Sequence, residues 1–362
     1  MGTGYLKIVT STANGNLPVQ ARVTIYCSGG TVLYEIQTDN NGITETVTLE
    51  APPIELALDP AHTEAPYSIY SVKAESPGFR TVTVHTVRIF DTITSILPVN
   101  MTPGWEERGD EYHIPVHQLL NPITQPIKKP EIHEPLQEAQ VPEHIMIHLG
   151  SPHEDAPDIQ VSFTDYVKIV ASQVIFPSWP PAAIEANIYA ITSLALNRIC
   201  TKWYKQQDLA AKFDITGSAI YDQPFVQHGQ TYQNVNDMVD RIHNRYIKRE
   251  GFPEPYFAQY CDGRHGTCIG LWQWGAVGLA MRGLNALEIL RYYYPLDVGI
   301  VVACKAHKLN IHPCQLPETS SGKLSQAEQS YEYMHTDKLL AMYLVARSMA
   351  NTVHGGSKPL QT

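Results

Sequence analysis

Two cysteines and a histidine stand close together in the tract YCDGRHGTCIGLWQWGAVGLA, which covers residues 260–280. Cys261, His265 and Cys268 supply the thiol and imidazole groups that zinc prefers in a tetrahedral site. They provide three ligands, so a fourth would come from water, Asp262 or a distant histidine. The two cysteines could instead form a disulfide or remain free buried thiols. The spacing alone leaves these three alternatives open.

A second group of residues could contact a carbohydrate. Trp272 and Trp274 lie on either side of Gln273, and both indole rings are large enough to stack on a sugar face. Side chains alternate in the turn that leads into a helix, so we expect at least one of the two tryptophans to lie in the core. Asp214 and Asp222 lie near each other in another tract, where they could line a groove or cap turns, and Tyr221 directly precedes Asp222.

The residues before these tracts predict a separate all-β domain. Segments of residues 1–102 alternate in polarity, are rich in Val, Ile and Thr, and are separated by turn signals such as Asp39-Asn40-Asn41-Gly42. Short strands at this spacing are typical of a small β-sandwich. Prolines then recur through residues 103–142, which predicts an extended linker with little core of its own.

The pattern from residue 143 onwards predicts the elements that must position the chemistry. Strands and helices mix irregularly over 143–312, which indicates an α+β domain. Pro181 suits the first turn of a long helix, residues 235–250 predict an amphipathic helix, and Asn285 with Glu288 predicts a capping box. A tail over 313–362 carries one more predicted helix. The predicted fold class is therefore an N-terminal all-β sandwich plus an α+β domain.

Three tracts of the α+β domain resemble the SpoIID domain of the sporulation stage II protein D family, most closely its clostridial branch. They cover residues 165–198, 213–226 and 254–295, within a resemblance that spans roughly residues 143–303. The third tract is the most specific, because the family signature Gly-(Met/Leu)-x-Gln-(Trp/Tyr)-Gly-Ala is present as Gly270 to Ala276. Trp272 replaces the usual Ser of that signature. The upstream tract QTDNNGITETVTL resembles carboxypeptidase-regulatory-like and Ig-like sandwich modules.

The resemblance implies peptidoglycan lytic transglycosylation, which needs one carboxylic acid. A glutamate of raised pKa protonates the glycosidic oxygen and then deprotonates the sugar's 6-hydroxyl. The corresponding position in this chain is Gln173 in one alignment and Val174 in another, so the catalytic Glu is missing. Asp222 is the best substitute acid. The resemblance further implies that Gln173, Tyr221, Asp222, Gln273 and Trp274 contact the glycan strand.

The resemblance also bears on the cysteine loop. Some SpoIID proteins bind zinc through Cys and His in this loop, whereas in the clostridial branch two cysteines fit the spacing without the histidine. The second pattern favours a Cys261–Cys268 disulfide over a zinc site.

Composition excludes some classes of partner. The chain has 362 residues, a formal net charge of −10 and no dense Lys/Arg patch, so we expect no nucleic-acid binding. No apolar run is long enough to predict a membrane span, and no signal peptide is visible.

Three hypotheses follow for a protein of the bacterial envelope, a spore or an assembled particle. The first is non-cleaving glycan-strand binding, and the second is a lytic transglycosylase that uses a substitute carboxylate. The third is a structural or attachment component of a spore layer or phage-tail-like particle. Such a component would join its assembly through the β-sandwich or the C-terminal helix.

Overall fold

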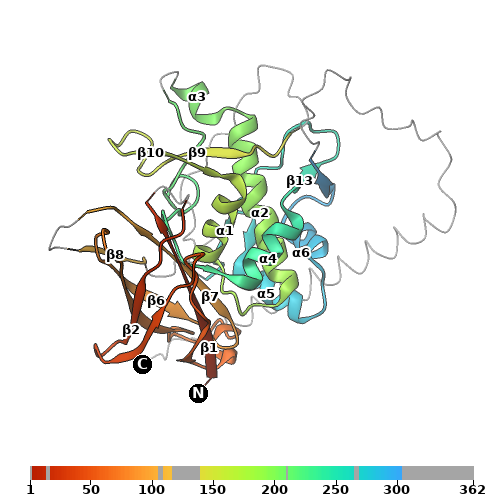
Figure 1. Cartoon of the computed structure of the whole chain (residues 1–362). Coiled ribbons are helices and arrows are strands. Elements are labelled where there is room, and N and C mark those ends of the chain that lie inside the picture. The colour runs from red at the N-terminus through yellow and green to blue at the C-terminus, as the bar shows by residue number, and fades with distance from the viewer. Residues whose placement is uncertain are drawn as a thin grey trace, which may run out of the picture. The chain divides into compact units, whose positions relative to one another are not determined.

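The computed structural model describes residues 2–13, 17–104, 109–115, 139–208, 211–264 and 269–303. These residues belong to one compact unit, Met1–Lys305. They form a β-rich mixed α/β structure in which a sandwich packs beside a layer of helices (Figure 1). The predicted tail over 313–362 lies outside the described residues, as does most of the predicted linker.

The sandwich consists of two sheets with the strand orders β12-β7-β1-β4 and β3-β2-β5-β6-β8, where β12 (Thr231–Tyr232) comes from the second part of the chain. Its strands are β1 (Gly2–Thr12), β2 (Arg22–Cys27), β3 (Val32–Gln37), β4 (Val47–Ala51), β5 (Ser68–Glu75), β6 (Val82–Ile89), β7 (Thr94–Met101) and β8 (Asp110–His113). Alternate side chains face the space between the sheets, as the period of two predicts. Leu6 and Ile8 of β1 and Val72 of β5 are fully buried there.

The sandwich continues past its predicted boundary at residue 102. β8 pairs in parallel with β6, with His113 opposite His85, and so forms an edge of the five-stranded sheet. The proline-rich composition of 103–142 concealed this short strand, which lies between Pro103 and Pro115. The prediction of an extended linker from residue 103 is therefore wrong for residues 110–113.

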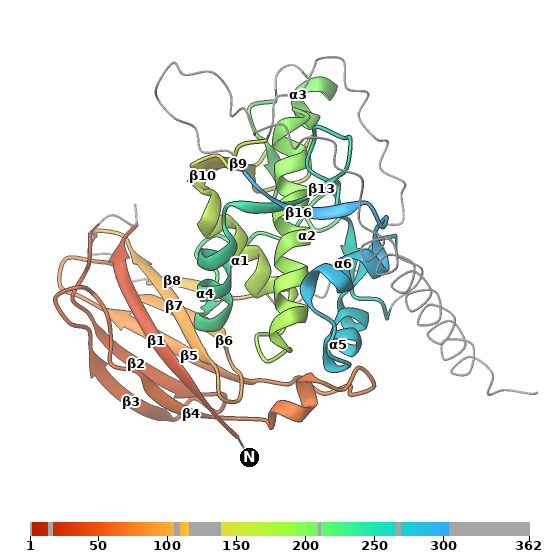
Figure 2. The same ribbon diagram turned by 90° about the vertical axis from the view of Figure 1, so that its right-hand side faces the viewer.

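The second part of the chain contains six helices and several short strands among the described residues. The helices are α1 (Phe163–Val174), α2 (Pro181–Cys200), α3 (Trp203–Gln207), α4 (Gln233–Ile242), α5 (Gln273–Met281) and α6 (Ala286–Tyr293). The strands are β9 (His144–His148), β10 (Asp158–Ser162), β11 (Ile215–Thr216), β12 (Thr231–Tyr232), β13 (Arg245–Arg249), β14 (Tyr260–Cys261), β15 (Leu271–Trp272) and β16 (Val298–Val302). α2 is central, with α1 and α4 on the sandwich side and α5 and α6 on the other (Figure 2).

Local signals placed several of these helices correctly. Pro181 opens α2, and the capping box of Asn285 and Glu288 starts α6. The helix predicted over 235–250 is only half right, because α4 ends at Ile242. Residues Arg245–Arg249 instead form β13, which pairs with the distant strand β16. Tertiary pairing therefore overrides the helical pattern after residue 242.

The sandwich and the helical layer have separate hydrophobic cores, and Ala57 and Phe90 from the N-terminal part pack into the core of the helical layer. β12 pairs with β7, so a strand from beyond α2 completes a sandwich sheet. Phe90 of the sandwich makes an edge contact with the ring of Tyr232 and a tilted contact with Phe176. Trp179 donates its indole N–H to the carbonyl of Ala57 at 2.9 Å. The helices thus rest on the sandwich through buried aromatic and polar contacts.

Candidate functional site

Gln173 lies in the last turn of α1, facing the sandwich. Its carboxamide Oε1 accepts a hydrogen bond from Nη2 of Arg88 on β6 at 3.0 Å. Gln173 is 3% exposed and Arg88 is 1% exposed. A carboxamide cannot donate and recover a proton at neutral pH, and this one is closed off from solvent. Gln173 therefore forms an interdomain contact.

Arg88 is surrounded by neutral groups. Its backbone N–H donates to Oε1 of Gln230 at 2.9 Å, and its guanidinium carbon lies 5.9 Å from the centre of the Tyr67 ring. Burial raises the pKa of the neighbouring Tyr232 to about 12, so that phenol stays protonated. Within the described residues no carboxylate pairs with Arg88, and its Nε and Nη1 atoms have no hydrogen-bond partner. The cluster therefore holds one buried positive charge.

The other aligned position, Val174, is fully buried and carries no acid. Its carbonyl accepts a hydrogen bond from Nε2 of Gln273 at 2.7 Å. Gln273 is the glutamine of the signature, so the first and third tracts meet at the end of α1. Gln273 itself is fully buried, and it positions the signature against α1.

The two tryptophans of the signature lie in different surroundings. Trp274 is 7% exposed and makes edge contacts with the rings of Phe176 and Trp179. Trp272 is 40% exposed, and its ring lies 6.2 Å from the ring of Tyr293. The prediction that at least one tryptophan lies in the core is confirmed. Trp272, which replaces the family's small residue, is the one that reaches the surface.

Two glycines of the signature are required by their surroundings. Gly270 has a φ of +103°, and a Cβ there would lie 2.0 Å from the carbonyl oxygen of Gln259. A Cβ on Gly275 would lie 1.9 Å from the phenol oxygen of Tyr293. The chain can therefore approach the Gln259 carbonyl at Gly270, and the Tyr293 phenol at Gly275, only because neither position carries a side chain.

Asp222 is part of a buried ion pair. Its Oδ1 accepts from Nε of Arg198 at 2.7 Å, and the exposed fractions of the two side chains are 0% and 2%. Its Oδ2 accepts from the Tyr204 hydroxyl and from both the N–H and the hydroxyl of Thr216. These bonds occupy both oxygens in the core. The hydrogen bonds of Asp222 therefore fit the structural role of stabilising a turn. They do not fit the role of an acid in a groove.

The five predicted glycan-contacting residues are mostly inside the protein. Gln173, Asp222, Gln273 and Trp274 are buried, and only Tyr221, at 42%, is exposed. The sandwich covers Gln173, whereas the other three are covered by the helical layer itself. Sequence patterns missed Arg88, the partner of Gln173. The single signal for Arg88 is its basic type within the otherwise apolar end of β6, VRIF.

The cysteine loop is described in part. Cys261 is disulfide-bonded, whereas Cys27 and Cys200 are free thiols. His265 and Cys268 lie outside the described residues, so pairing of Cys261 with Cys268 stays a prediction. The described residues contain no group of three or more potential metal ligands. A sulfur in a disulfide cannot serve as a thiolate ligand, so the disulfide and a zinc site that uses Cys261 exclude each other.

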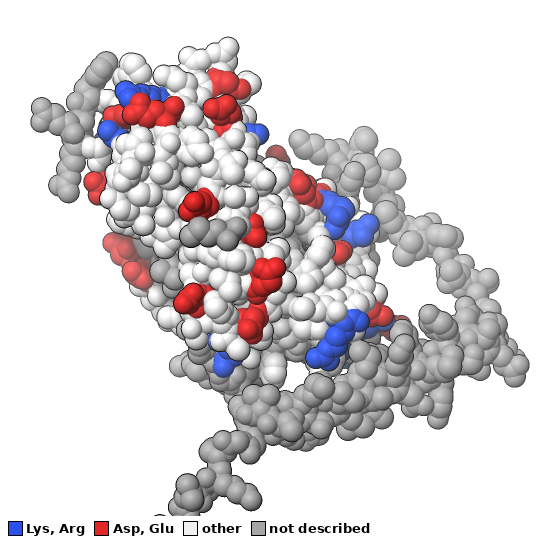
Figure 3. Space-filling view, turned by 90° about the horizontal axis from the view of Figure 1, so that it is seen from below, with Lys and Arg blue, Asp and Glu red and all other residues white. Residues whose placement is uncertain are grey.

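The surface charge is mainly acidic on the face drawn in Figure 3. Acidic side chains are spread over this face, and the basic ones form no dense patch on its described part. This distribution agrees with the formal net charge of −10. No helix in the described part of the chain is long and apolar enough to cross a membrane.

Comparisons with known proteins give little guidance. No model of a protein family matches the chain, and no curated protein matches it. A search of solved structures finds the Bacillus anthracis TIE protein, at 21% identity over 28% of this chain and 18% of that chain, with a TM-score of 0.19. It also finds GBS52, the minor pilin of Streptococcus agalactiae, at 12% identity over 30% of this chain and 47% of that chain, with a TM-score of 0.21.

A third structure is hydroxyquinol 1,2-dioxygenase from Pseudomonas putida DLL-E4. It has 13% identity over 28% of this chain and 57% of that chain, with a TM-score of 0.20. The chain spans less than two thirds of the length of each of these three proteins. Such low scores carry no argument about function.

Proposed function

We propose that this protein binds peptidoglycan glycan strands without cleaving them. The observation that carries the proposal is the bond between Gln173 and Arg88. The chain resembles a glycan-cleaving domain, but by that resemblance Gln173 stands where that domain has its catalytic acid. The sandwich covers Gln173 and keeps a glycan strand away from it. Such a protein would still bind glycan strands, but it has no acidic group at Gln173 that could cleave them.

A substitute acid receives no support from the geometry. Asp222 makes four hydrogen bonds in the core, and protonating it would break its pair with Arg198. An acid for glycoside cleavage must reach the glycosidic oxygen within hydrogen-bond distance. Because Asp222 is 1% exposed, a glycan strand cannot approach it without unfolding its surroundings.

Trp272 offers the surface for binding. Its ring is 40% exposed beside Tyr293, and it stands in the most specific tract of the resemblance. Gly263 packs directly against it, since a Cβ there would lie 2.8 Å from the Trp272 Cβ. An aromatic ring held in this way provides a flat apolar face at low cost in side-chain entropy.

The test uses the whole chain with purified sacculi. We expect co-sedimentation with the sacculi, and mass spectrometry of the incubated glycan should detect no anhydromuramic products. Release of such products would overturn the non-cleaving part of the proposal. Failure to sediment at any sacculus concentration would overturn glycan binding itself.

A second candidate is an attachment component of a larger assembly, and one observation favours it. β3 is an edge strand, and its residues Val32 and Leu33 are 47% and 44% exposed. An edge strand with exposed apolar side chains can pair with a strand from another protein. The candidate predicts that the protein sediments with a particle rather than with sacculi, and that Val32→Lys releases it.

A further inference from the structure

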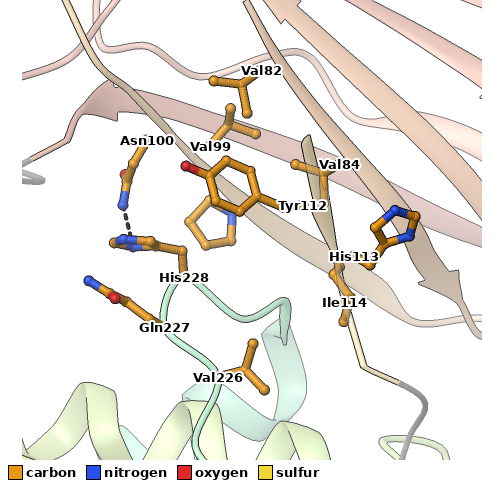
Figure 4. Close-up of a pocket in the computed structure, with 11 residues that line it drawn as sticks. Val82, Val84, Val99, Asn100, Tyr112, His113, Ile114, Val226, Gln227 and His228 are labelled. Carbon is orange, nitrogen blue, oxygen red and sulfur yellow. Dashed lines mark hydrogen bonds between the residues drawn. The ribbon is translucent and has the colours of Figure 1, made fainter. Parts of the chain in front are cut away.

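A small pocket lies where the sandwich meets the segment before β12 (Figure 4). The side chains of Val82, Val84, Val99 and Ile114 line its inside, and all four are buried. The cavity measures about 80 Å³, roughly half of a cavity of about 150 Å³ that holds a benzene molecule. It can therefore hold one small chemical group, and a sugar ring is too large for it.

The rim of this pocket is polar. It carries Asn100 of β7, Tyr112 of β8, and Gln227 and His228 from the segment before β12. Figure 4 shows the phenol end of Tyr112 on the same side as Asn100 and His228, whereas the ring of His113 points away. The His113 ring instead stacks on that of His85, with 4.6 Å between the ring centres.

Asn100 fixes the proton of His228. The oxygen of Asn100 accepts from the Ser11 hydroxyl at 2.7 Å, and its Nδ2 donates to Nδ1 of His228. Since Nδ1 accepts this hydrogen bond, the neutral imidazole carries its proton on Nε2. The Nε2–H group is then a donor with no partner among the described residues.

Three groups of the rim are exposed and therefore accessible to a ligand. The Nε2–H of His228, the carboxamide of Gln227 and the hydroxyl of Tyr112 make no hydrogen bond within the described part of the chain. His228 also holds a left-handed φ of +59°, a conformation that side-chain-bearing residues adopt at a cost. Such backbone strain concentrates at binding sites, where neighbouring contacts maintain it.

We propose that this pocket binds the acetamido group of an N-acetylated amino sugar. The methyl group would contact the buried valines, while the amide oxygen accepts from His228 and the amide N–H donates to Gln227. The sugar ring would lie outside the cavity against Tyr112, which is 49% exposed. This inference rests on the proposed function, because glycan strands of peptidoglycan carry such groups.

The chemistry of the pocket separates this ligand from simpler ones. An aliphatic side chain of a partner protein would fill the floor and leave the three rim groups without partners. Water would form hydrogen bonds with the rim groups, but it would make no favourable contact with the apolar side chains of the floor. An acetamido group uses the floor and two of the rim groups, His228 and Gln227, because it combines one methyl group with one donor and one acceptor. The attached sugar ring would then lie against the third rim group, Tyr112.

The test compares two neutral ligands that differ by one methyl group. Glucosamine oligomers fully acylated with acetyl or with formyl groups are titrated into the full chain by calorimetry. We expect the acetyl oligomer to bind about fourfold more tightly, the effect of burying one methyl group. His228→Gly, which accepts the left-handed backbone, should weaken acetyl binding by about tenfold, as expected for losing one good hydrogen bond.

Thermal unfolding of His228→Gly verifies that the variant is folded, and His243→Gly, in another turn, is the matched control. Equal affinity for the two oligomers, or full affinity in the folded His228→Gly protein, would overturn the pocket assignment. Sacculus binding that persists in that case keeps the proposed function. Selective acetyl binding without any sacculus binding would reject the proposed function and leave the pocket assignment standing.

Discussion

Gln173 of α1 and Arg88 of β6 are joined by a hydrogen bond of 3.0 Å between two almost completely buried side chains. A buried guanidinium is stable only when it is well hydrogen-bonded or paired with a carboxylate. Here a neutral carboxamide takes the place that a carboxylate could fill. This hydrogen bond connects the two parts of the chain, and the carboxamide of Gln173 cannot act as an acid.

Gln173→Glu should stabilise the protein at pH 7. The new carboxylate would pair with Arg88 and add roughly 1 kcal/mol to the free energy of unfolding, because an ionised acceptor replaces the neutral one that Arg88 already has. The pair lowers the folded-state pKa of that Glu below its unfolded value of about 4.3. The gain is therefore present above about pH 4.3 and is lost as the pH falls through the folded pKa.

Urea unfolding at pH 7 and at acidic pH measures this effect. Gln206→Glu, on the exposed face of α3, is the control and should change stability little. A Gln173→Glu variant less stable than the original at pH 7 would show that Arg88 does not act as the partner. We also expect the variant to release no anhydromuramic products, because the sandwich still covers the site.

Asp222→Asn should cost about 3–5 kcal/mol of unfolding free energy, because it leaves Arg198 charged and buried without its partner. Chemical denaturation measures this loss. The control is Glu35→Gln, which breaks the exposed pair with Arg22 and should change the stability little. If Asp222→Asn were as stable as the control, the buried ion pair would not be a structural element.

Trp272→Gln should weaken sacculus binding by roughly tenfold or more, the effect expected of an aromatic residue at the centre of a binding surface. Trp272→Tyr keeps a ring and should retain most of the affinity. Ile220→Gln changes an apolar residue that is 74% exposed elsewhere and should bind normally. Quantitative pelleting with sacculi measures all three, and equal retention of the Gln and Tyr variants would rule out stacking at Trp272.

Gly275→Ala should destabilise the protein by about 1–3 kcal/mol, because the new Cβ would overlap the phenol oxygen of Tyr293. The control lies in the same helix: Gly278 has open space around its Cα, so Gly278→Ala should add about 0.5–1 kcal/mol. Adding Tyr293→Phe to Gly275→Ala should recover part of the loss. Thermal melts of the original protein, Gly275→Ala, Tyr293→Phe and the double variant form a double-mutant cycle, and strict additivity would exclude the contact.

Peptide mapping without reductant should find Cys261 in a disulfide-linked peptide, because Cys261 is disulfide-bonded in the structure. We propose Cys268 as the partner. The same sample should contain no stoichiometric zinc, which elemental analysis measures. One zinc ion per chain together with a free Cys261 thiol would favour the metal site instead.

Local sequence signals predicted the parts of the fold that depend on neighbouring residues. The Asp39 turn is an example: its Oδ1 accepts from the N–H groups of Asn41 and Ile43, and Gly42 takes a φ of +73°. The capping box at Asn285 is another. Such features need only a few adjacent residues, so their spacing is visible in the sequence.

Contacts between distant residues could not be predicted in this way. β8 and β12 are too short to show a period, and their places in the sandwich depend on partners far along the chain. The resemblance directs attention to Gln173, whereas the contact of Gln173 with Arg88 crosses between two domains. Nothing in the local pattern near either residue specifies the other.

The pairing of β12 with β7 affects how the chain folds during synthesis. Residues 94–101 leave the ribosome long before residues 231–232. The edge of β7 that pairs with β12 therefore has no partner while α1 and α2 are synthesised. Closing so long a loop is slow, and unpaired strand edges favour misassembly in partly folded chains. The four-stranded sheet is therefore completed only after most of the helical layer has been synthesised, and the two parts complete their folding together.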